Sequence, residues 1–349
     1  MRGLIFHDVE SVAYERLPDP ALEEPTDAIV QVDLAGLCGS DLHVYHGRER
    51  GLDTGTILGH ELLGEIVAVG AEVSRFRVGD RVVSPFTTSC GACFYCHRGL
   101  TCRCERGQLY GWVEGGHGLH GAQAELVRVP LADSTLVAVP PEADDDVALF
   151  TGDILATGFF CAELAAFEPG AVVVVLGCGP VGLMAAVAAC ELEAGRVFAV
   201  DGVAGRRELA ARLGAEPLPL GESTRDLVLE ATAGRGADAV LEAVGSADAS
   251  RLAVDLLRPG GTLAAVGVHN EPTFAFTPAE AYDKNLTFRT GRCPARAYMD
   301  RLVPLVAAGK YELSAIISHR LPLAEGAAAY ELFASRAPGC NKILLRPGG

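Results

Sequence analysis

The sequence lacks both a long hydrophobic run and an excess of basic residues. Its 349 residues include 29 Lys and Arg against 45 Asp and Glu, which gives a formal net charge of -16. This balance argues against nucleic acid or an anionic membrane as the main partner and favours a small-molecule ligand. The most apolar region, roughly 154–190, is interrupted by Glu163, by Glu168-Pro169-Gly170 and by glycines after Leu176. We therefore expect no membrane-spanning segment.

The sequence also shows no internal repeat and no low-complexity segment, and we expect no export signal. The N-terminal stretch Met1 to Asp8 reaches a charged residue before the apolar core of a signal peptide could develop. The eleven cysteines are odd in number and favour metal ligands and reduced thiols over a disulfide framework. We therefore expect a cytoplasmic protein.

The length and the 49% hydrophobic content are sufficient for two domains, each with its own core. Up to about residue 152, short alternating stretches punctuated by Gly, Pro and Asp favour a β-rich, barrel-like domain. The continuous apolar run at 171–176 is typical of a strand buried on both faces of a parallel sheet. Further apolar strands are expected at 197–200, 239–243 and 263–268, with helix-like segments between them, so we expect a doubly wound parallel sheet within 153–291. Residues 292–349 break this alternation and are expected to return to the first domain.

Four closely spaced cysteines predict a metal site. Cys90, Cys93, Cys96 and Cys104 form a C-x2-C-x2-C-x7-C pattern in a lobe of about residues 88–106. Four thiolates can surround one tetrahedral Zn²⁺ and leave no open position for a substrate, so such a site would be structural. Two alternatives remain at this point: the cysteines are free or disulfide-linked, or nearby Cys102 replaces Cys104 as the fourth ligand.

A glycine-rich segment after the buried strand predicts a dinucleotide site. Gly177-Cys-Gly179-Pro180-Val181-Gly182 matches the G-x-G-x-x-G fingerprint in the strand-to-helix context that this motif needs. The glycines allow a tight turn and close approach to a pyrophosphate. Asp201 lies about 20 residues further on, where its carboxylate can accept hydrogen bonds from the adenosine ribose. The alternative is an ordinary glycine-rich turn with a solvated Asp.

A second group of candidate ligands lies in the first domain. Cys38 stands in the segment Gly36 to His43, and His60 stands in Gly59-His60-Glu61. A thiolate and an imidazole are good Zn²⁺ ligands, and a catalytic zinc needs only three protein ligands plus an exchangeable position. Taken alone, His60 could be an ordinary structural histidine. Together with Cys38 and the cysteine lobe, it favours a catalytic metal site.

These motifs, in this order, resemble the alcohol dehydrogenase group of the zinc-dependent medium-chain dehydrogenase/reductase superfamily, over essentially the whole length. The resemblance implies an α/β protein with a GroES-like β-rich catalytic domain and a Rossmann domain. Many members hold the catalytic zinc with a second cysteine, but this chain has Asp153 in the corresponding segment Thr151 to Gly158. The related branch with Cys-His-Asp coordination implies that Asp153 is the third ligand. Its alternative role is at the N-terminal end of the following helix, where the helix dipole favours an acidic residue.

The resemblance also implies roles for other residues. Glu61 would be a near or transient zinc ligand, and Asp41 would orient His60. Ser40 would take the substrate proton and pass it through the cofactor ribose toward His43. Two basic residues would contact the cofactor, one at the adenosine ribose and one near the pyrophosphate: Arg206, which could instead be simply solvated, and Lys342.

The implied activity is hydride transfer between NAD and an alcohol/aldehyde or ketone pair, with two zinc ions per chain. NAD is expected over NADP because the 2′-phosphate of NADP would meet the charge of Asp201. The segments 118–125 and 290–294 resemble the branch of formaldehyde and threonine dehydrogenase-like enzymes. An alternative is therefore a polyol or amino-alcohol dehydrogenase of the sorbitol, butanediol or threonine type. Relatives in the family are homodimers or homotetramers, so a homo-oligomer is expected.

The substrate pocket is the last prediction from the resemblance. Its walls would come from four residues, although the aromatic ones could equally belong to the core and the arginine could bind the cofactor. These residues are Phe86, Trp112, Arg292 and Cys293.

Overall fold

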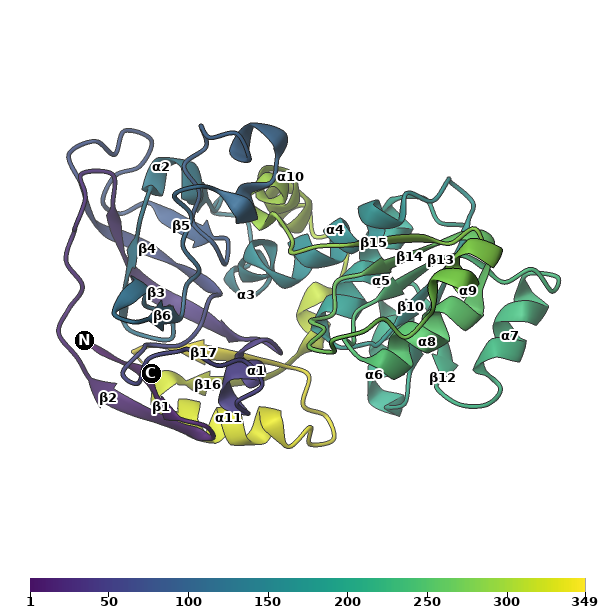
Figure 1. Ribbon diagram of the computed structural model, residues 1–349. Helices are drawn as coiled ribbons and strands as arrows, with labels where there is room; N and C mark the ends of the chain where they lie inside the picture. The colour runs from purple at the N-terminus through teal and green to yellow at the C-terminus, as the bar shows by residue number, and fades with distance from the viewer. Residues whose placement is uncertain (349) are drawn as a thin grey trace. The chain divides into compact units, whose positions relative to one another are not determined.

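The computed structural model describes residues 1–348 and divides them into two compact units (Figure 1). Unit 1 comprises Met1–Ala156, Pro294–Lys310 and the chain from Ile316 onward, and unit 2 comprises Thr157–Cys293 with Tyr311–Ala315. The first division therefore falls a few residues after the expected one. Helix α4 (Ile154–Ala165) runs across it, so no turn or loop marks the division in the sequence.

Unit 1 is built on a mainly antiparallel sheet with the strand path β16-β17-β3-β4-β5-β9, in which β8 also pairs with β3 and only β16 and β17 run parallel. The antiparallel pairs β1-β2 and β6-β7 form two separate two-stranded sheets. The C-terminal strand β17 places Leu344 opposite Gly36 of β3. The strands are β1 (Arg2–Asp8), β2 (Ser11–Arg16), β3 (Ala28–Leu37), β4 (Leu62–Val69), β5 (Arg81–Ser84), β6 (Trp112–Glu114), β7 (His117–Leu119), β8 (Leu126–Val129), β9 (Val137–Ala138), β16 (Ile317–Pro322) and β17 (Lys342–Arg346).

The helices of unit 1 are short, apart from two near the C-terminal part of the chain. They are α1 (Asp41–Tyr45), α2 (Ala132–Thr135), α3 (Asp145–Ala148), α10 (Ala295–Ala307) and α11 (Gly326–Ala334). Single turns of 3-10 helix occur at Cys96–Arg98, Thr101–Arg103, Leu149–Gly152, Leu313–Ile316 and Leu323–Glu325.

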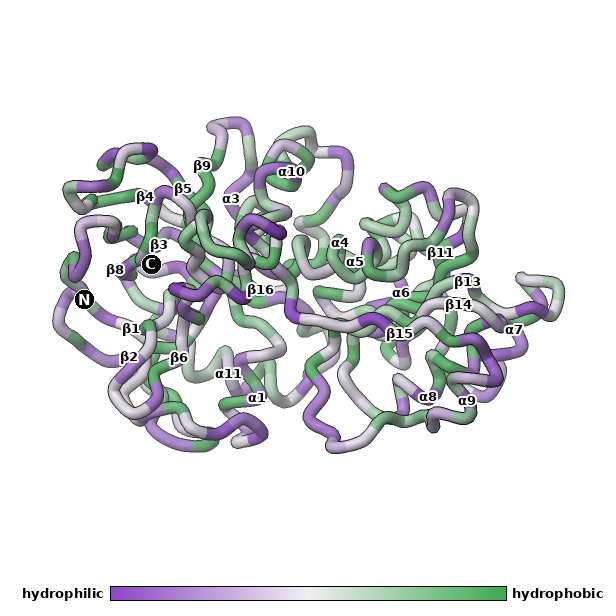
Figure 2. Tube along the Cα trace, turned by 45° about the horizontal axis from the view of Figure 1, so that its top comes forward, coloured by the Kyte–Doolittle hydropathy of each residue, from purple (hydrophilic) through white to green (hydrophobic). Residues whose placement is uncertain are grey.

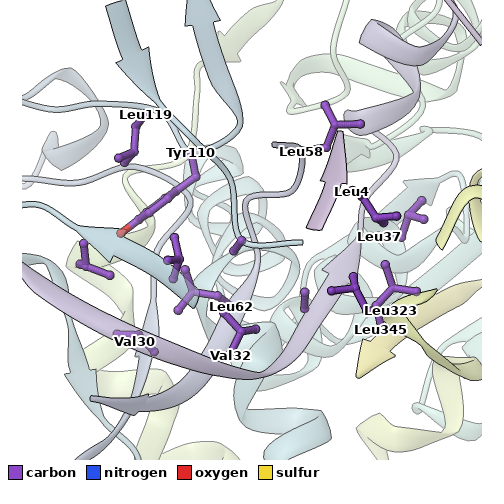
Figure 3. Close-up of a cluster of buried hydrophobic side chains, with 14 of the residues drawn as sticks. Leu4, Val30, Val32, Leu37, Leu58, Leu62, Tyr110, Leu119, Leu323 and Leu345 are labelled. Atoms are coloured by element: carbon purple, nitrogen blue, oxygen red, sulfur yellow. The ribbon is translucent and has the colours of Figure 1, made fainter. Parts of the chain in front are cut away.

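The core of unit 1 gathers apolar side chains from strands that are far apart in the sequence. Figure 3 shows Val30 and Val32 of β3 in one cluster with Leu62 of β4 and Leu345 of β17. These positions follow the two-residue period of a strand, so each strand turns alternate side chains into the cluster. The resulting sheet carries the loops on which the candidate ligands stand.

Unit 2 is a six-stranded parallel sheet with the order β12-β11-β10-β13-β14-β15. The predicted doubly wound sheet is confirmed. Strand β10 is the apolar run Val172–Leu176, which is buried along most of its length. The other strands are β11 (Arg196–Asp201), β12 (Glu216–Pro219), β13 (Ala237–Glu242), β14 (Leu257–Ala265) and β15 (Thr287–Thr290). The sequence order reverses between β10 and β13, and ligands of such sheets bind at this point, outside the carboxyl ends of the strands.

The helices of unit 2 connect these strands. They are α5 (Pro180–Glu191), α6 (Ala204–Arg212), α7 (Thr224–Ala231), α8 (Ala247–Leu256) and α9 (Pro278–Asp283), in addition to α4. Helix α5 is largely hydrophobic, as Figure 2 shows, and most of its residues are buried. Its first residue is Pro180, which suits this position because the N–H that proline lacks would have no partner inside the helix.

Within residues 1–348, no single helix is both long and apolar enough to cross a membrane. The pair Asp145–Gly152 and Ile154–Ala165, bent by 48°, passes the same test by length and composition alone.

Candidate active site

Four side chains from three separate segments of unit 1 converge on one point. Cys38 follows β3, His60 and Glu61 precede β4, and Asp153 precedes α4. One ligand atom from each of these residues lies within 4.8 Å of the others. The structure therefore brings together all four residues that the sequence predicted around the catalytic metal.

The imidazole of His60 is held from both sides. Its Nδ1 lies 3.1 Å from Asp41 Oδ1, and its Nε2 lies 3.4 Å from Asp153 Oδ2 and 3.3 Å from Ser40 Oγ. The other oxygen of Asp41 accepts the backbone N–H of Cys38 at 2.9 Å. Asp41 thus fixes both a candidate ligand ring and a candidate ligand backbone. Outer carboxylates commonly orient metal-binding imidazoles in this way.

Gln123 and Tyr330, which were not predicted as site residues from the sequence, support Asp41 through hydrogen bonds. Gln123 is fully buried and its Nε2 lies 3.2 Å from the carbonyl oxygen of Gly36 and 3.5 Å from Asp41 Oδ2. Its Oε1 accepts the hydroxyl of the buried Tyr330 at 2.8 Å. Gln123 lies within the segment 118–125, which resembles formaldehyde and threonine dehydrogenase-like enzymes. Its role depends on contacts with residues far away in the sequence, so the segment alone did not reveal it.

Electrostatics favour a cation at this cluster. Burial raises the pKa of the Cys38 thiol to about 11. Burial alone would lower the pKa of His60, but the carboxylates of Asp41 and Asp153 raise it well above its usual range. Burial opposes ionisation of Asp153, yet contact with His60 outweighs it and holds the pKa of Asp153 below its usual range. Cys38 and His60 thus bind protons strongly while Asp153 keeps its negative charge. Such a buried set suits a divalent metal, and Zn²⁺ accepts all three ligand types.

Glu61 and Lys342 form a buried ion pair beside the cluster. Both side chains are fully buried, and Lys342 Nζ lies 2.6 Å from each carboxylate oxygen of Glu61 and 3.2 Å from the carbonyl oxygen of Leu37. The family resemblance implies a position near a pyrophosphate for Lys342. The structure instead gives its ammonium group partners inside unit 1, because β17 lies next to β3.

Gly36 makes room for this ion pair. A Cβ atom at Gly36 would lie 1.9 Å from Glu61 Oε2, so any other residue would displace the carboxylate. The glycine of the segment 36–43 therefore has a packing role that its place in the motif did not reveal.

Ser40 and His43 lie at the start of α1. The hydroxyl of Ser40 reaches the His60 ring, and His43 is half-buried with its backbone N–H donated to the Ser40 carbonyl at 3.0 Å. Burial lowers the pKa of His43, which favours the neutral imidazole that can accept a proton.

The four cysteines of the lobe form a second cluster. One sulfur atom each from Cys90, Cys93, Cys96 and Cys104 lies within 4.8 Å of the others, and Cys102 is not part of this group. The Cys104 sulfur accepts backbone N–H groups from Cys90 at 3.1 Å and from Arg106 at 3.4 Å. A backbone hydrogen bond from Glu105 lowers the pKa of Cys93 to about 6. Clustered thiols with backbone donors fit a closed tetrahedral zinc site.

In unit 2, the glycine-rich turn follows β10 and opens α5. Gly177 has a φ of 88°, which a glycine adopts without strain. A Cβ at Gly182 would lie 1.7 Å from the carbonyl oxygen of Gly177, so the helix packs tightly on the turn. Beside Gly179, by contrast, the space is open. Tight packing at the first and last glycines and open space at the middle one suit a turn that receives a pyrophosphate.

Asp201 lies at the end of β11, next to this turn. One of its oxygens accepts the backbone N–H of Cys178 at 2.8 Å, and the other accepts that of Val203 at 2.7 Å. The guanidinium of Arg206 lies 3.8 Å from the carboxylate. The structure thus brings Asp201 and Arg206 together at the glycine-rich turn.

The four residues predicted for the substrate pocket divide between the units. Phe86 lies beside the candidate metal site, where its ring meets that of His60 edge-on at 6.3 Å between centroids. Trp112 is half-buried, and its Nε1 donates to Glu114 Oε2 at 3.3 Å. Arg292 is exposed and Cys293 buried at the end of the main segment of unit 2. The substrate-pocket role of all four residues stays a prediction.

Comparison with known proteins agrees with this arrangement. Residues 24–141 match the family model described as "Alcohol dehydrogenase GroES-like domain", and residues 180–308 match that described as "Zinc-binding dehydrogenase". The chain is 41% identical to zinc-type alcohol dehydrogenase B of Aspergillus flavus over 357 aligned positions, which cover 100% of this chain and 82% of that protein.

A solved structure and a further relative extend the comparison. The alcohol dehydrogenase of Thermus sp. ATN1 is 42% identical and superposes with a TM-score of 0.93, covering 99% of this chain and 100% of that one. The NADP-dependent isopropanol dehydrogenase of Thermoanaerobacter brockii is 34% identical and covers 91% of this chain and 92% of its own length.

Proposed function

The chain belongs to the alcohol dehydrogenase group of the zinc-dependent medium-chain dehydrogenase/reductase superfamily, and on that premise we propose that it transfers a hydride between NAD and an alcohol/aldehyde or ketone pair. The observation that carries this proposal is the buried convergence of Cys38, His60 and Asp153, with the Ser40 hydroxyl at the same imidazole. Three such ligands leave a fourth position of a tetrahedral metal for a substrate.

The proposed catalytic zinc is held by Cys38, His60 and Asp153. When bound, zinc supplies Lewis-acid chemistry that polarises the substrate oxygen and favours the alkoxide. The protein holds the ligands in place: Asp41 keeps the His60 ring in one orientation, and the Lys342 ammonium holds the Glu61 carboxylate. Glu61 is therefore proposed to lie near the zinc without binding it at rest, because its carboxylate is paired with Lys342.

We propose that Ser40 accepts the proton of the substrate hydroxyl and that His43 receives it next. The position of the Ser40 hydroxyl beside His60 and the lowered pKa of His43 support this order. A general base within hydrogen-bonding reach of the reacting group typically contributes a factor of about 10² to 10⁴ to the rate.

The proposed second zinc occupies the cysteine lobe and stabilises it without taking part in the reaction. Metal analysis by plasma mass spectrometry of freshly purified, active protein should give two zinc ions per chain. Mild chelation should remove one of them first, because only the Cys38 site has an open position. One zinc or none in an active sample would contradict the proposal.

NAD is proposed as the cofactor because of Asp201. Its carboxylate lies at the strand end beside the glycine-rich turn, where it can bind ribose hydroxyls and would repel a 2′-phosphate. Arg206 could attract such a phosphate, but it already lies next to the Asp201 carboxylate. We expect kcat/KM with NAD to exceed that with NADP by at least about tenfold, or roughly 1.4 kcal/mol.

The Asp201→Ser variant tests this assignment. It should reduce the preference for NAD, because it removes the charge that opposes the 2′-phosphate. A wild-type enzyme that uses NADP as well as NAD, or a variant with an unchanged ratio, would show that Asp201 does not select the nucleotide.

The activity itself is tested with a panel of primary and secondary alcohols, aldehydes, ketones, polyols and amino alcohols, followed by NAD(H) absorbance. A simple alcohol or carbonyl compound should give the highest kcat/KM. If no member of the panel changes the absorbance, the proposed hydride transfer is wrong. If sorbitol, butanediol or threonine exceeds all simple alcohols, the substrate class is that of a polyol or amino-alcohol dehydrogenase.

We also propose a cytoplasmic homo-oligomer, a dimer or a tetramer. Within residues 1–348 none of the cysteines forms a disulfide, which suits a reducing compartment. Aromatic side chains are exposed near the end strand β15 of unit 2, with Tyr282 87% and Phe274 68% exposed. Exposed apolar groups beside an unpaired strand edge favour contact with a second copy. Light scattering after size-exclusion chromatography measures the assembly directly.

A further inference from the structure

Three valines that follow parallel strands leave apolar surface exposed at one edge of the sheet of unit 2. Val203 follows β11, Val244 follows β13 and Val268 follows β14, and their exposed fractions are 45%, 52% and 40%. The carboxyl ends of parallel strands share one edge, and the reversal of strand order between β10 and β13 marks the ligand crevice there. These valines therefore stand on the side of the sheet where the proposed dinucleotide binds.

The turns that carry Val244 and Val268 pack backbone against backbone. A Cβ at Gly245 would lie 2.4 Å from the carbonyl oxygen of Val268, and a Cβ at Gly267 would lie 2.1 Å from the Gly245 nitrogen. Val244 in turn reaches the glycine-rich turn, because its Cγ2 would lie 2.6 Å from a Cβ at Gly177. A shift of one turn must therefore displace the others.

Glu242, the last residue of β13, holds both turns. It is fully buried, and its Oε1 accepts the backbone N–H groups of Val244 and Gly245, each at 2.7 Å. Its carbonyl oxygen accepts the N–H groups of Val266 at 3.0 Å and of Gly267 at 3.2 Å. The carboxylate of Glu242 thus holds the turn of Val244, and its backbone carbonyl holds the turn that leads to Val268.

His269 holds the remaining oxygen of Glu242. Its Nε2 lies 2.9 Å from Glu242 Oε2, and its Nδ1 lies 3.2 Å from Glu271 Oε2. Glu271 also accepts the backbone N–H of Ala247 at 3.2 Å, at the first residue of α8. His269 is the only histidine in the sequence between residues 157 and 293. It therefore joins the buried carboxylate to the segment that leaves β14.

We propose that His269 is a positioning residue for the nicotinamide half of the dinucleotide. Asp201 marks the adenosine half at β11, whereas Val244 and Val268 lie across the reversal of strand order, at β13 and β14. By holding Glu242, His269 fixes the apolar wall against which that half packs. The inference rests on the proposed function, since it assumes that a dinucleotide binds at this edge.

The test compares two ligands that share the adenosine end. NADH is titrated by fluorescence and AMP by calorimetry, with the zinc-loaded protein. His269→Leu should raise the Kd of NADH by about tenfold and change the Kd of AMP by less than about twofold, because AMP reaches only the adenosine half. His269→Gln should recover most of the NADH affinity, since a glutamine Nε2 can donate to Glu242 from a similar position.

His7→Leu is the matched control. His7 lies 2.8 Å from Glu15 in an exposed His-Glu pair of unit 1, so its loss should change neither affinity. Equal weakening of NADH and AMP in His269→Leu, or NADH affinity within about twofold of wild type, would overturn the positioning role. If that variant does not fold, Glu271→Gln provides the comparison, with about a threefold loss for NADH expected and an unchanged NADH affinity refuting the inference.

The outcome for the wild type separates the two proposals. A wild-type protein that binds neither NADH nor NADPH contradicts the proposed function and with it this inference. A wild-type protein that binds NADH tightly, combined with an unaltered His269→Leu variant, contradicts the inference alone.

Discussion

Removing the ammonium group of Lys342, beside the candidate metal site, should destabilise unit 1 in a way that depends on pH. In Lys342→Met, a side chain of similar length and no charge replaces the fully buried lysine. The Glu61 carboxylate then loses the donor that lies 2.6 Å from both of its oxygens. Because both groups are buried, solvent cannot replace the missing contact, and the carboxyl must become protonated or remain an unpaired buried charge.

The magnitude follows from the pKa of Glu61. Burial raises this pKa from 4.5 to about 7 even with Lys342 present, so the variant will hold the carboxyl neutral at pH 7. Wild type shares the cost of a protonated carboxyl up to about pH 7, so the loss specific to the variant is about 1.36 kcal/mol for each pH unit above 7, or about 3 kcal/mol at pH 9. This lies at the lower end of the roughly 3–5 kcal/mol found when one member of a buried ion pair is removed.

The sign of the pH dependence is fixed by the same values. An acid whose folded pKa is raised stabilises the folded state in its protonated form, below the unfolded pKa, and this contribution is lost as the pH rises. The deficit of Lys342→Met relative to wild type should therefore change little between pH 5 and pH 7 and grow from pH 7 toward pH 9, where Glu61 ionises beside Lys342 in wild type only. Urea unfolding at several pH values measures it, and the single tryptophan, Trp112, reports on unit 1.

A double-mutant cycle separates the ion pair from other effects. Glu61→Met combined with Lys342→Met replaces the pair by apolar side chains, and such replacements are often neutral. At pH 9 the double variant should therefore be more stable than Lys342→Met alone, with a coupling energy of at least about 2 kcal/mol. Metal-free protein is used for the cycle, so that zinc affinity does not contribute. Additive effects, with coupling below about 0.5 kcal/mol, would show that the ion pair does not carry the stability assigned to it.

Three further predictions concern the active site and one distant histidine. Asp153→Asn should reduce the zinc content from two ions to one per chain. It should also lower activity by at least about 100-fold, since loss of a residue that only supports a ligand already costs about 10–100-fold. Unchanged zinc content by mass spectrometry would instead assign Asp153 a role at the N-terminal end of α4. Ser40→Ala should keep both zinc ions but lower kcat by about 100-fold in steady-state assays, as expected for loss of a general base. Burial lowers the pKa of His120, whose Nδ1 accepts the Ile57 N–H at 3.1 Å, so its contribution to stability is present above the unfolded pKa of 6.5 and lost as the pH falls. In urea unfolding, His120→Asn should therefore be less sensitive than wild type to acidification below pH 6.5, and parallel stability curves would refute this.

The central part of the fold was predictable because its signal is local. The apolar run of β10 and the glycine-rich turn after it lie together in the sequence, and hydrophobic periodicity identified β11, β13 and β14 around them. The end strands were not recognised. Strand β12 contains Pro217 and Pro219, which oppose a strand reading from sequence alone. Its place at the end of the sheet, next to β11, makes those prolines tolerable, because only one side of the strand needs hydrogen-bond donors.

The grouping of the candidate metal ligands was predictable for a similar reason. Cysteines spaced by two residues, or a His next to a Glu, are visible within a few positions of the sequence. The sequence did not show which residues hold the candidate ligands and Asp41 in position. Gln123 and Tyr330 join Asp41 through a chain of hydrogen bonds that spans 207 residues between Tyr330 and Gln123. No spacing rule links such distant polar residues, so only the folded sheet reveals their contact.

Lys342 shows why a charged residue is the hardest to assign from sequence. A lysine near the end of a chain is most simply read as exposed, since Lys is rarely buried without a partner. Its partner here, Glu61, lies 281 residues away and is itself next to a candidate metal ligand. The pairing arises because β17 packs beside β3, which brings Lys342 to the end of the strand that precedes Cys38. The positive charge of Lys342 compensates one of the carboxylates at the proposed metal site. The ion pair therefore affects the charge of that site as well as the stability of unit 1.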